Sequence, residues 1–478
     1  MKKIKKFLCI AIAFAFIFVG CKKTGSAANG NTAYVKDNTA QISETALENG
    51  IKLIVKKQAT NRIYSIRVNY NGGNALTPDG KDGIESLTLS TMLTASKNYP
   101  HDDIEQILHE TTSNMGSGSG LDMSWATFNT LDKYWDKASD VFFDCLVNPL
   151  FDDGDFEVKV KDANAAWVKD STDQMTTTID SLLTKSRAGH PYGKFTVPTD
   201  ISLKNISLND VKTWHAEKLT ADRMVVVAVG NFDVNKLKTQ LNKTLGKIPV
   251  KNNVIPEIPP MNLKSTLYTE EFPTANGMAN IRGDYEIPNR HSPDFTKLQL
   301  AYSILDELAF AIVRTDHGAC YSIWAGIHGF NQSYGSLVIY RTQKPSEAKR
   351  YFDEAIAVLA SGKSLKLKDD GDNSTHYAPL AETLEAYKAK FINDFFSAQY
   401  ANAAIAGQIA SNYYYHSDPT AYLKVIEEIN STTPEDIVRV VNQYLVNAKV
   451  SWMVCSDNAT LRKLDKAAFS GFTGSVQK

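Results

Sequence analysis

Two serines four residues apart, Ser86 and Ser90, stand where a helix could hold a metal ion. Positions i and i+4 of an α-helix share one face, so two imidazoles at this spacing can bind zinc beside a carboxylate that acts as general base. In the inverted zinc motif H-x-x-E-H the base directly precedes the second His, and here that position is Leu89. Neutral hydroxyls are poor zinc ligands and Leu cannot move a proton. The segment therefore has the spacing of a zinc helix but neither its ligands nor its base.

An ordinary amphipathic helix is the alternative for the same segment. Ile84, Leu87 and Thr91 form one stripe at helical spacing, and the small serines would allow close packing. The choice between the two interpretations rests on the neighbouring motifs.

Those motifs follow a recognisable order along the chain. They are a turn and strand at 47–55, a strand at 63–70, the helix from Gly83, the sequence His190-Pro191-Tyr192-Gly193, a helix ending near Leu219 and a strand at 223–231. This order resembles the pitrilysin/insulinase family of zinc metallopeptidases, in particular the mitochondrial-processing-peptidase-like type built from subunits of about this length. The resemblance covers nearly the whole mature chain and identifies it with the subunit that lacks the H-x-x-E-H motif.

A second family motif lies in the C-terminal half. Arg314 and Tyr321 stand seven residues apart in a segment that ends Gly318-Ala319-Cys320-Tyr321-Ser322. The resemblance implies that this pair reaches a substrate bound at zinc, the Tyr phenol donating to the developing oxyanion and the Arg holding the peptide backbone. The alternative is that Arg314 is a helix-end cation and Tyr321 a strand aromatic, both serving packing alone.

The resemblance also implies a third metal ligand, a Glu on a later helix. Aligning 162–169 with that helix places Lys169 there, and a slip of one residue gives Val168 or Asp170. The nine His residues are scattered with no i, i+4 pair, so we expect no metal site and no cofactor in this chain.

Composition bounds the remaining possibilities. The 478 residues are more than one domain usually needs, and 43% of them are hydrophobic, which is ample for full cores. With 52 basic against 53 acidic residues and no long run of either sign, nucleic acid is not an expected partner.

The N-terminus carries a targeting signal. A basic segment, 1–6, precedes an apolar core, 7–19, too short for a comfortable transmembrane helix, and Phe18-Val19-Gly20-Cys21 resembles a bacterial lipobox. The resemblance implies cleavage before Cys21 and lipidation of its thiol. Because Lys22 is not the aspartate of the common retention signal, an outer-membrane protein facing the periplasm is favoured. The alternative is an uncleaved anchor with an incidental Cys21.

The mature chain contains an internal repeat. The capped helix start Ser207-Leu208-Asn209-Asp210 recurs as Thr433-Pro434-Glu435-Asp436, 226 residues later (436 − 210), and a strand follows each copy in register. We therefore predict an α+β fold with two homologous domains, each a mostly antiparallel sheet with helices packed mainly on one face, together forming half of a clamshell.

The chain divides at its Pro-rich and polar segments. We expect a lipoprotein signal peptide at 1–20, a flexible tether at 21–40, an N-terminal peptidase-like domain with the degenerate zinc motif at 41–252, a Pro-rich linker at 253–262 and a C-terminal peptidase-like domain with the Arg/Tyr pair at 263–478. Helices are expected at 83–97, 101–114, 131–147, 153–170, 207–219, 294–314, 346–360, 378–413 and 433–446, and a flexible turn at the Gly-Ser segment 115–120.

These features lead to a functional hypothesis. The resemblance implies the non-catalytic subunit of a heterodimeric envelope metallopeptidase, whose partner subunit carries an intact H-x-x-E-H motif and the zinc and cuts unfolded peptides. Arg314 and Tyr321 would act in trans, and Cys21 would anchor the chain to the membrane. The alternative is a catalytically inactive peptide-binding or scaffolding lipoprotein of the same fold. An independently active zinc peptidase is disfavoured, because two ligand positions and the base position are substituted.

Overall fold

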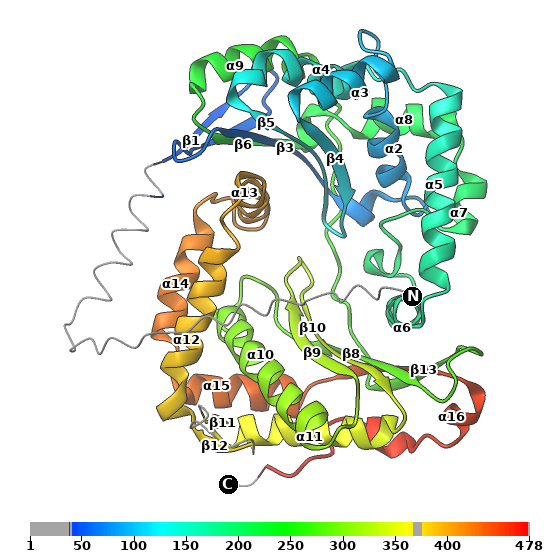
Figure 1. Ribbon diagram of the computed structural model, residues 1–478, viewed down its shortest axis with the longest axis vertical. Helices are drawn as coiled ribbons and strands as arrows, with labels where there is room; N and C mark the ends of the chain where they lie inside the picture. Colours follow the sequence, from blue (N-terminus) through cyan, green and yellow to red (C-terminus); the bar gives the residue numbers. More distant parts are fainter. Residues whose placement is uncertain (1–37, 39–40, 367–374, 477–478) are drawn as a thin grey trace, which may run out of the picture.

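The computed structural model describes residue 38 and residues 41–366 and 375–476. The predicted signal peptide, Cys21 and nearly all of the tether lie outside these described residues. The described chain forms two halves, each a sheet covered by helices (Figure 1). Within the described ranges, no helix is both long and apolar enough to cross a membrane.

The first sheet belongs to the N-terminal half and has the strand order β1-β2-β6-β3-β5-β4. Strands β2 and β6 run parallel, and all other neighbours are antiparallel. The strands are β1 (Ile42–Ala46), β2 (Lys52–Lys57), β3 (Ile63–Asn71), β4 (Asn114–Ser119), β5 (Met123–Leu131) and β6 (Met224–Gly230).

The second sheet repeats this topology in the C-terminal half. Its order is β7-β13-β8-β10-β9, again with one parallel pair, β7 with β13. It matches the first sheet strand for strand once β1 is set aside, which confirms the predicted α+β fold with two homologous domains. The strands are β7 (Thr266–Glu271), β8 (Ala279–Glu286), β9 (Ser322–His328), β10 (Tyr334–Thr342) and β13 (Val450–Ser456), with a small hairpin of β11 (Lys363–Leu365) and β12 (Tyr377–Pro379) nearby.

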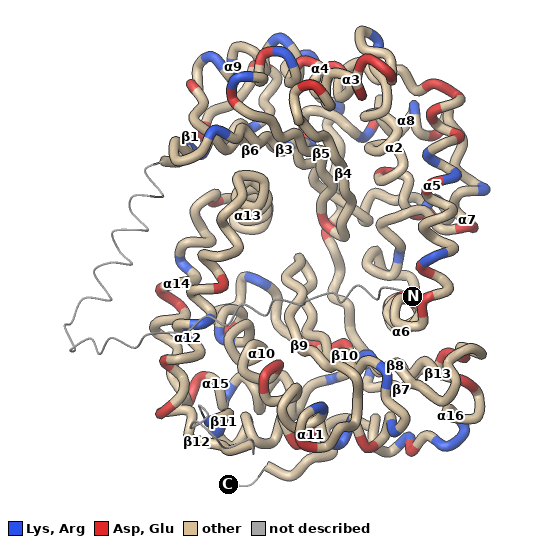
Figure 2. Tube along the Cα trace, viewed as in Figure 1, with Lys and Arg blue, Asp and Glu red and all other residues tan. Residues whose placement is uncertain are grey.

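Helices connect the strands in both halves. The N-terminal half contains α2 (Ile84–Met92), α3 (His101–Thr111), α4 (Trp135–Val147), α5 (Asp153–Ser171), α6 (Gln174–Ser186), α7 (Asp200–Asn205), α8 (Leu208–Lys218) and α9 (Val234–Lys243). The C-terminal half contains α10 (Phe295–Ala309), α11 (Pro345–Ala360), α12 (Leu380–Ser397), α13 (Asn402–His416), α14 (Ala421–Ser431), α15 (Pro434–Val441) and α16 (Asn458–Arg462), and α10 continues as the π-helix η6 (Phe310–Asp316). Basic and acidic residues alternate along the outer helices, while the strands are mostly uncharged (Figure 2).

The two central strands, β6 and β13, are buried along their whole length. Continuous apolar runs such as Met224–Gly230 are typical of strands covered on both faces. Each half supplies helices to only one face of its sheet. The other face is covered by a helix from the opposite half: α13 lies on β3 and β6, and α6 lies on β13 and β8 (Figure 1). In the first of these contacts, Ile405 and Ile409 pack on Ile54 and Val227. Each half thus has its own helices mainly on one face of its sheet, as expected, and receives one helix from the other half on the second face.

Polar contacts hold the exchange in place. The Arg187 guanidinium, which follows α6, donates to the Asp284 carboxylate on β8, and Arg282 Nε donates to the same carboxylate over 2.8 Å. Arg187 also stacks on the Tyr334 ring, 4.0 Å from its centroid. All of these groups are buried, so the ion cluster fixes α6 on the second sheet.

A second joint is built on Asp122, a 2% exposed residue in the turn between β4 and β5. Its carboxylate accepts hydrogen bonds from the hydroxyl groups of Tyr192 and Tyr415 and from the amide of Asn331. Two of these donors come from the C-terminal half. The Tyr of the His-Pro-Tyr-Gly motif is therefore part of the joint, and His190 of that motif contacts the linker at the Pro259 carbonyl, 2.8 Å away.

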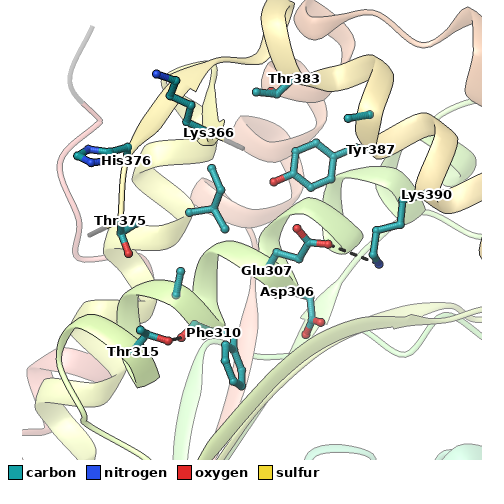
Figure 3. Close-up of a pocket in the computed structure, with 13 residues that line it drawn as sticks. Asp306, Glu307, Phe310, Thr315, Lys366, Thr375, His376, Thr383, Tyr387 and Lys390 are labelled. Atoms are coloured by element: carbon teal, nitrogen blue, oxygen red, sulfur yellow. Dashed lines mark hydrogen bonds and ion pairs between the residues drawn. The ribbon is translucent and has the colours of Figure 1, made fainter. Parts of the chain in front are cut away.

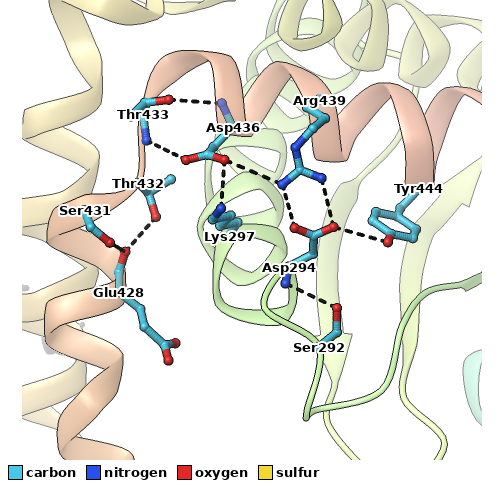
Figure 4. A network of polar contacts seen from close by, with 10 residues as sticks. All are labelled: Ser292, Asp294, Lys297, Glu428, Ser431, Thr432, Thr433, Asp436, Arg439 and Tyr444. Atoms are coloured by element: carbon cyan, nitrogen blue, oxygen red, sulfur yellow. Dashed lines mark hydrogen bonds and ion pairs between the residues drawn. The ribbon is translucent and has the colours of Figure 1, made fainter.

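The repeated helix starts form as predicted. Ser207 and Thr433 each close a capping box with the Asp three residues later. In the second copy, Asp436 also accepts a hydrogen bond from Lys297 Nζ at 2.8 Å, and the neighbouring Arg439 pairs with Asp294 (Figure 4). The caps thus connect α15 to the start of α10.

Some element predictions were wrong. The segment 378–413 is two helices, interrupted near Tyr400, which is 84% exposed. The Gly-Ser segment is the edge strand β4, because an added Cβ at Gly118 would lie 2.5 Å from the Trp125 ring and the bare glycine accommodates that ring. Helix α6 was missed altogether. Its Thr-rich sequence has low helix propensity, and the helix is held by the Asp173 cap and by burial of Thr178 and Leu182.

His328 of β9 lies near Arg187 and Arg282 of the buried ion cluster, and we expect it to make the protein less stable in acid. Burial, together with the positive charges of Arg282 and Arg187, lowers the pKa of His328 to about 4 against 6.5 for an ordinary His. The unfolded chain therefore binds more protons between pH 6.5 and pH 4, and stability falls as the pH drops through that window. We expect His328 to account for about 2 kcal/mol of this loss.

Urea denaturation at pH 7 and pH 4.5 measures the effect. His328→Gln should unfold with a smaller difference between the two pH values than the wild type. The exposed His109→Gln should leave the difference unchanged. Equal pH dependence in wild type and His328→Gln would show that another group titrates.

Candidate functional site

Helix α2 carries the predicted remnant of a zinc motif. It begins after Gly83, which has a left-handed φ of 73° and lies so close to Pro198 that an added Cβ would be 2.0 Å from its nitrogen. Ser86 and Ser90 are half-buried on one face. Leu89 has 0% exposure and belongs to the core of the N-terminal half. The position aligned with the general base has thus become a packing position.

Among the described residues, no metal-binding group of side chains surrounds the two serines. Ser90 Oγ donates to the Leu87 carbonyl of its own helix over 3.0 Å. Lys159 of α5 lines the small cavity beside Ser90, whereas Lys169 is exposed in the last turn of that helix. Across residues 38, 41–366 and 375–476 there is no group of three or more His, Cys, Asp or Glu side chains that could hold a metal ion. The residues on α2 therefore do not suit zinc.

Helix α2 is anchored by a buried ion pair that the sequence pattern did not reveal. The Glu85 carboxylate forms an ion pair with Arg223 Nη2 at 2.9 Å and accepts a hydrogen bond from Trp214 Nε1. Arg223 also donates to the carbonyl groups of Asn71 and Lys218, so all of its donor groups lie within hydrogen-bond range. In the sequence, only the charge of Glu85 within an apolar helix could have indicated this ion pair. Its role is to hold α2 in place.

The Arg/Tyr pair lies in the C-terminal half, Arg314 on η6 and Tyr321 directly before β9. Arg314 Nε donates to the Tyr321 carbonyl over 2.7 Å, and its guanidinium lies 5.1 Å from the centre of the Phe310 ring. The Tyr321 side chain is 67% exposed, and its ring meets the edge of Tyr340. The phenol group makes no hydrogen bond to any described residue, so it is available to a ligand.

The backbone beneath Tyr321 is irregular on both sides. A π-helix carries Arg314, and β10 has a bulge between Ile339 and Thr342 in which Arg341 adopts a positive φ of 54°. The Tyr321 amide donates to the carbonyl groups of Tyr340 and Arg341 at this bulge. Single π-turns, bulges and non-glycine residues at positive φ concentrate at functional sites. We call Arg314, Tyr321 and the irregular backbone beneath them, the π-helix η6 and the bulge of β10, the platform.

A cavity of about 700 Å³ opens behind this platform (Figure 3). Phe310 and Thr315 of η6 line it together with Tyr387 of α12. At its floor Asp306 accepts the 2.8 Å hydrogen bond of the Ala325 amide on edge strand β9, and burial raises the pKa of its carboxyl. An ion pair between Glu307 and Lys390, 3.4 Å long, crosses one side.

The structure does not bring the two predicted half-sites together. Helix α2 packs on α5, α8 and β4 in the N-terminal half, whereas η6 packs on α10, α11 and β9 in the C-terminal half. Figure 1 shows the two sets in opposite halves of the molecule. Within one chain, Ser86 and Tyr321 therefore serve no common substrate atom.

Part of the chain matches known proteins in sequence. The family described as Peptidase M16 inactive domain matches residues 205–365, a range that includes Arg314 and Tyr321. The alpha subunit of the mitochondrial-processing peptidase of Solanum tuberosum is 23% identical over 197 residues. That match spans 41% of this chain but only 38% of the length of the relative.

The chain is a homologue of the M16, or insulinase-type, peptidases. With hydroxyls and a buried Leu at its motif positions, this M16 homologue is of the non-catalytic kind.

Solved structures agree on the fold. The M16 inactive domain from Pseudomonas fluorescens superposes with a TM-score of 0.76 at 16% identity, covering 87% of this chain and 98% of that one. A protease from Helicobacter pylori gives 0.74 at 14% identity, covering 87% and 99%. A chain of complex III2 from Candida albicans, bound to Inz-5, gives 0.72 at 14% identity, covering 90% and 98%. At these identities the likeness concerns the fold alone.

Burial of Leu89 predicts that the M16 motif cannot simply be restored. A glutamate at this position would place a carboxylate in an apolar core, so we expect Leu89→Glu to lower the free energy of unfolding by about 3 kcal/mol or more. Ser86→His, at a half-buried position, should change it by less than about 1 kcal/mol. Urea denaturation of the two variants measures the contrast. A Leu89→Glu protein as stable as wild type would show that residue 89 reaches solvent.

Proposed function

We propose that this M16 homologue is the non-catalytic subunit of a heterodimeric zinc metallopeptidase acting on unfolded peptides in the bacterial envelope. The observation that carries the proposal is Tyr321, an exposed phenol on an irregular platform, in a chain whose own motif helix lacks ligands. Such a platform has a catalytic use only if a second subunit supplies the metal. That the relative from Solanum tuberosum is itself named a peptidase subunit supports the same arrangement.

The proposed chemistry divides between the subunits. The partner, with an intact H-x-x-E-H helix, would hold zinc, which activates water for attack on the peptide carbonyl. Tyr321 would donate its phenolic proton in a hydrogen bond to the developing oxyanion, and Arg314 would hold the peptide backbone. A preorganised donor of this kind is worth about 3 kcal/mol in the transition state. Arg314 already positions the Tyr321 backbone through its 2.7 Å hydrogen bond.

Co-purification is the first test of a partner. The chain is extracted from its own membranes in mild detergent, and co-eluting proteins are identified by mass spectrometry. A stoichiometric H-x-x-E-H relative supports the composite peptidase. Recovery of the chain alone or as a homodimer, without zinc or peptidase activity, supports the alternative of an inactive peptide-binding or scaffolding lipoprotein, which the cavity between the two halves also favours.

Loss of the Tyr321 hydroxyl should reduce the turnover of the assembled peptidase. We expect Tyr321→Phe to lower kcat about 100-fold with unchanged assembly, because only the oxyanion loses a donor. Hydrolysis of a fluorogenic peptide by the reconstituted pair measures kcat, and gel filtration measures assembly. Tyr400→Phe, an equally conservative change at an exposed tyrosine outside the platform, is the control. Wild-type kcat in Tyr321→Phe would remove the proposed role.

We further propose that lipidated Cys21 holds the chain in the envelope, at the periplasmic face of the outer membrane. The supporting observation is the lipobox-like sequence that precedes Cys21. Cys21→Ser should move the protein from the membrane fraction to the soluble fraction and abolish its labelling by a radioactive fatty acid. Continued membrane association with no label in the wild type would support the uncleaved anchor.

A further inference from the structure

A cavity of about 570 Å³ lies between the two halves, apart from α2 and from the Arg/Tyr platform. Its walls come from β3, β5, α5, α6, α13 and the turn between β9 and β10. Residues of both exchanged helices, α6 and α13, line it. Its size is within the range of cavities that enclose small ligands.

One wall of the cavity presents a cation. Arg67 of β3 is half-buried, and its Nε donates to Asn69 Oδ1 over 2.8 Å. The guanidinium forms no ion pair with any described carboxylate, and burial lowers its pKa to about 10. Asn69 Nδ2 beside it is buried without a hydrogen-bond partner among the described residues. Asn69 is not among the residues that line the cavity, so of these two residues only Arg67 presents its donors there, and a partly desolvated cation without a counter-charge suits an anionic group.

The cation is held by an aromatic support. Its guanidinium lies over the Trp125 ring, 4.3 Å from the centroid. On the adjacent edge strand, Gly118 leaves room for the same indole, since an added Cβ would be 2.5 Å from it. From the opposite side, the bare Gly407 of α13 approaches Arg67 Nη1, with space for a Cβ at 3.6 Å. Gly118 thus makes room for the indole, and Gly407, which lines the cavity, leaves the guanidinium uncovered there.

Another wall presents carboxylates. Asp170 of α5 and Asp180 of α6 both line the cavity. Burial raises the pKa of Asp180 to about 6, with Asp170 adding to the shift and Arg282 opposing it. No described side chain donates a hydrogen bond to either carboxylate. The aromatic residues Trp167 and Phe330 also line the cavity.

We propose that this cavity binds a short unblocked peptide, its α-carboxylate on Arg67, its α-ammonium facing Asp170 and Asp180, and an apolar side chain among the aromatic residues. Two other charged residues line the cavity but are already paired: Lys194 with Asp79, and Asp122 with the hydroxyl groups of Tyr192 and Tyr415. Arg67 and the two carboxylates remain, and a zwitterion complements both signs. A phosphate or nucleotide would satisfy Arg67 but be repelled by the two carboxylates. The site belongs to this chain alone, so it depends neither on a partner nor on zinc and stands apart from the proposed peptidase function.

Calorimetry on the purified full-length chain tests the proposal. The probes are the tetrapeptide Ala-Phe-Leu-Ala with free termini, the same peptide with an amidated C-terminus, and the same peptide with an acetylated N-terminus. We expect the free peptide to bind, amidation to weaken binding about tenfold or more, and acetylation to weaken it by a similar factor. Absence of binding up to about 5 mM, or equal affinity for all three probes, would overturn the proposal.

Variants assign each terminus to its wall. In Arg67→Met the free and amidated peptides should bind with equal, weakened affinity, and in Asp180→Asn the penalty of acetylation should shrink. Arg62→Met, at an arginine outside the cavity, and Asp162→Asn, on the exposed face of α5, are the matched controls and should bind all three peptides like the wild type. Thermal melting shows which variants remain folded.

Gly407→Leu provides a test that changes no charge. Its side chain would extend over Arg67 and fill the open side of the stack, so all three peptides should lose affinity together. An unchanged affinity for the free peptide in folded Gly407→Leu would place the ligand elsewhere and contradict the proposal.

Discussion

The exchange of helices between the two sheets is the constraint on which the rest of the structure depends. Strands β6 and β13 are apolar on both faces, yet each half covers only one face with its own helices. Exposing the other face would leave a large apolar surface in water, at a cost that grows with its area. Helix α13 of the C-terminal half covers the open face of the first sheet, and α6 of the N-terminal half covers that of the second. Neither half is therefore complete alone, and the two fold as one unit.

The exchange also explains why buried charges sit at the junction. Asp122 and Asp284 each accept donors from both halves. A buried ion pair adds little net stability compared with an apolar contact, but loss of one partner leaves a costly buried charge. The joints therefore penalise any arrangement in which the halves slip, so that α6 and α13 keep their register and the cavity between them keeps its shape.

The sequence predicted what local pattern determines. The duplicated topology followed from the capped starts at Ser207 and Thr433 and the apolar runs behind them, and the empty motif followed from the resemblance of the neighbouring motifs to the family. Helix α6 was not predicted because its run of threonines has low helix propensity, and the Asp173 cap and its position on the second sheet stabilise it. The cavity could not be predicted because Arg67, Trp125 and Asp180 are far apart in the chain. Each of them alone has the pattern of an ordinary half-buried strand or helix residue.

Separate cores explain how one half-site can be lost while another persists. Leu89 packs in the core of the N-terminal half, whereas the Arg314 and Tyr321 platform packs on the core of the C-terminal half. Ser86, Leu89 and Ser90 lie on a helix that packs on the first core, and η6 packs on the second. The cavity on Arg67 rests on the junction and on neither core alone. If the proposed roles hold, the substitutions on α2 leave both the platform and the cavity of this chain in place.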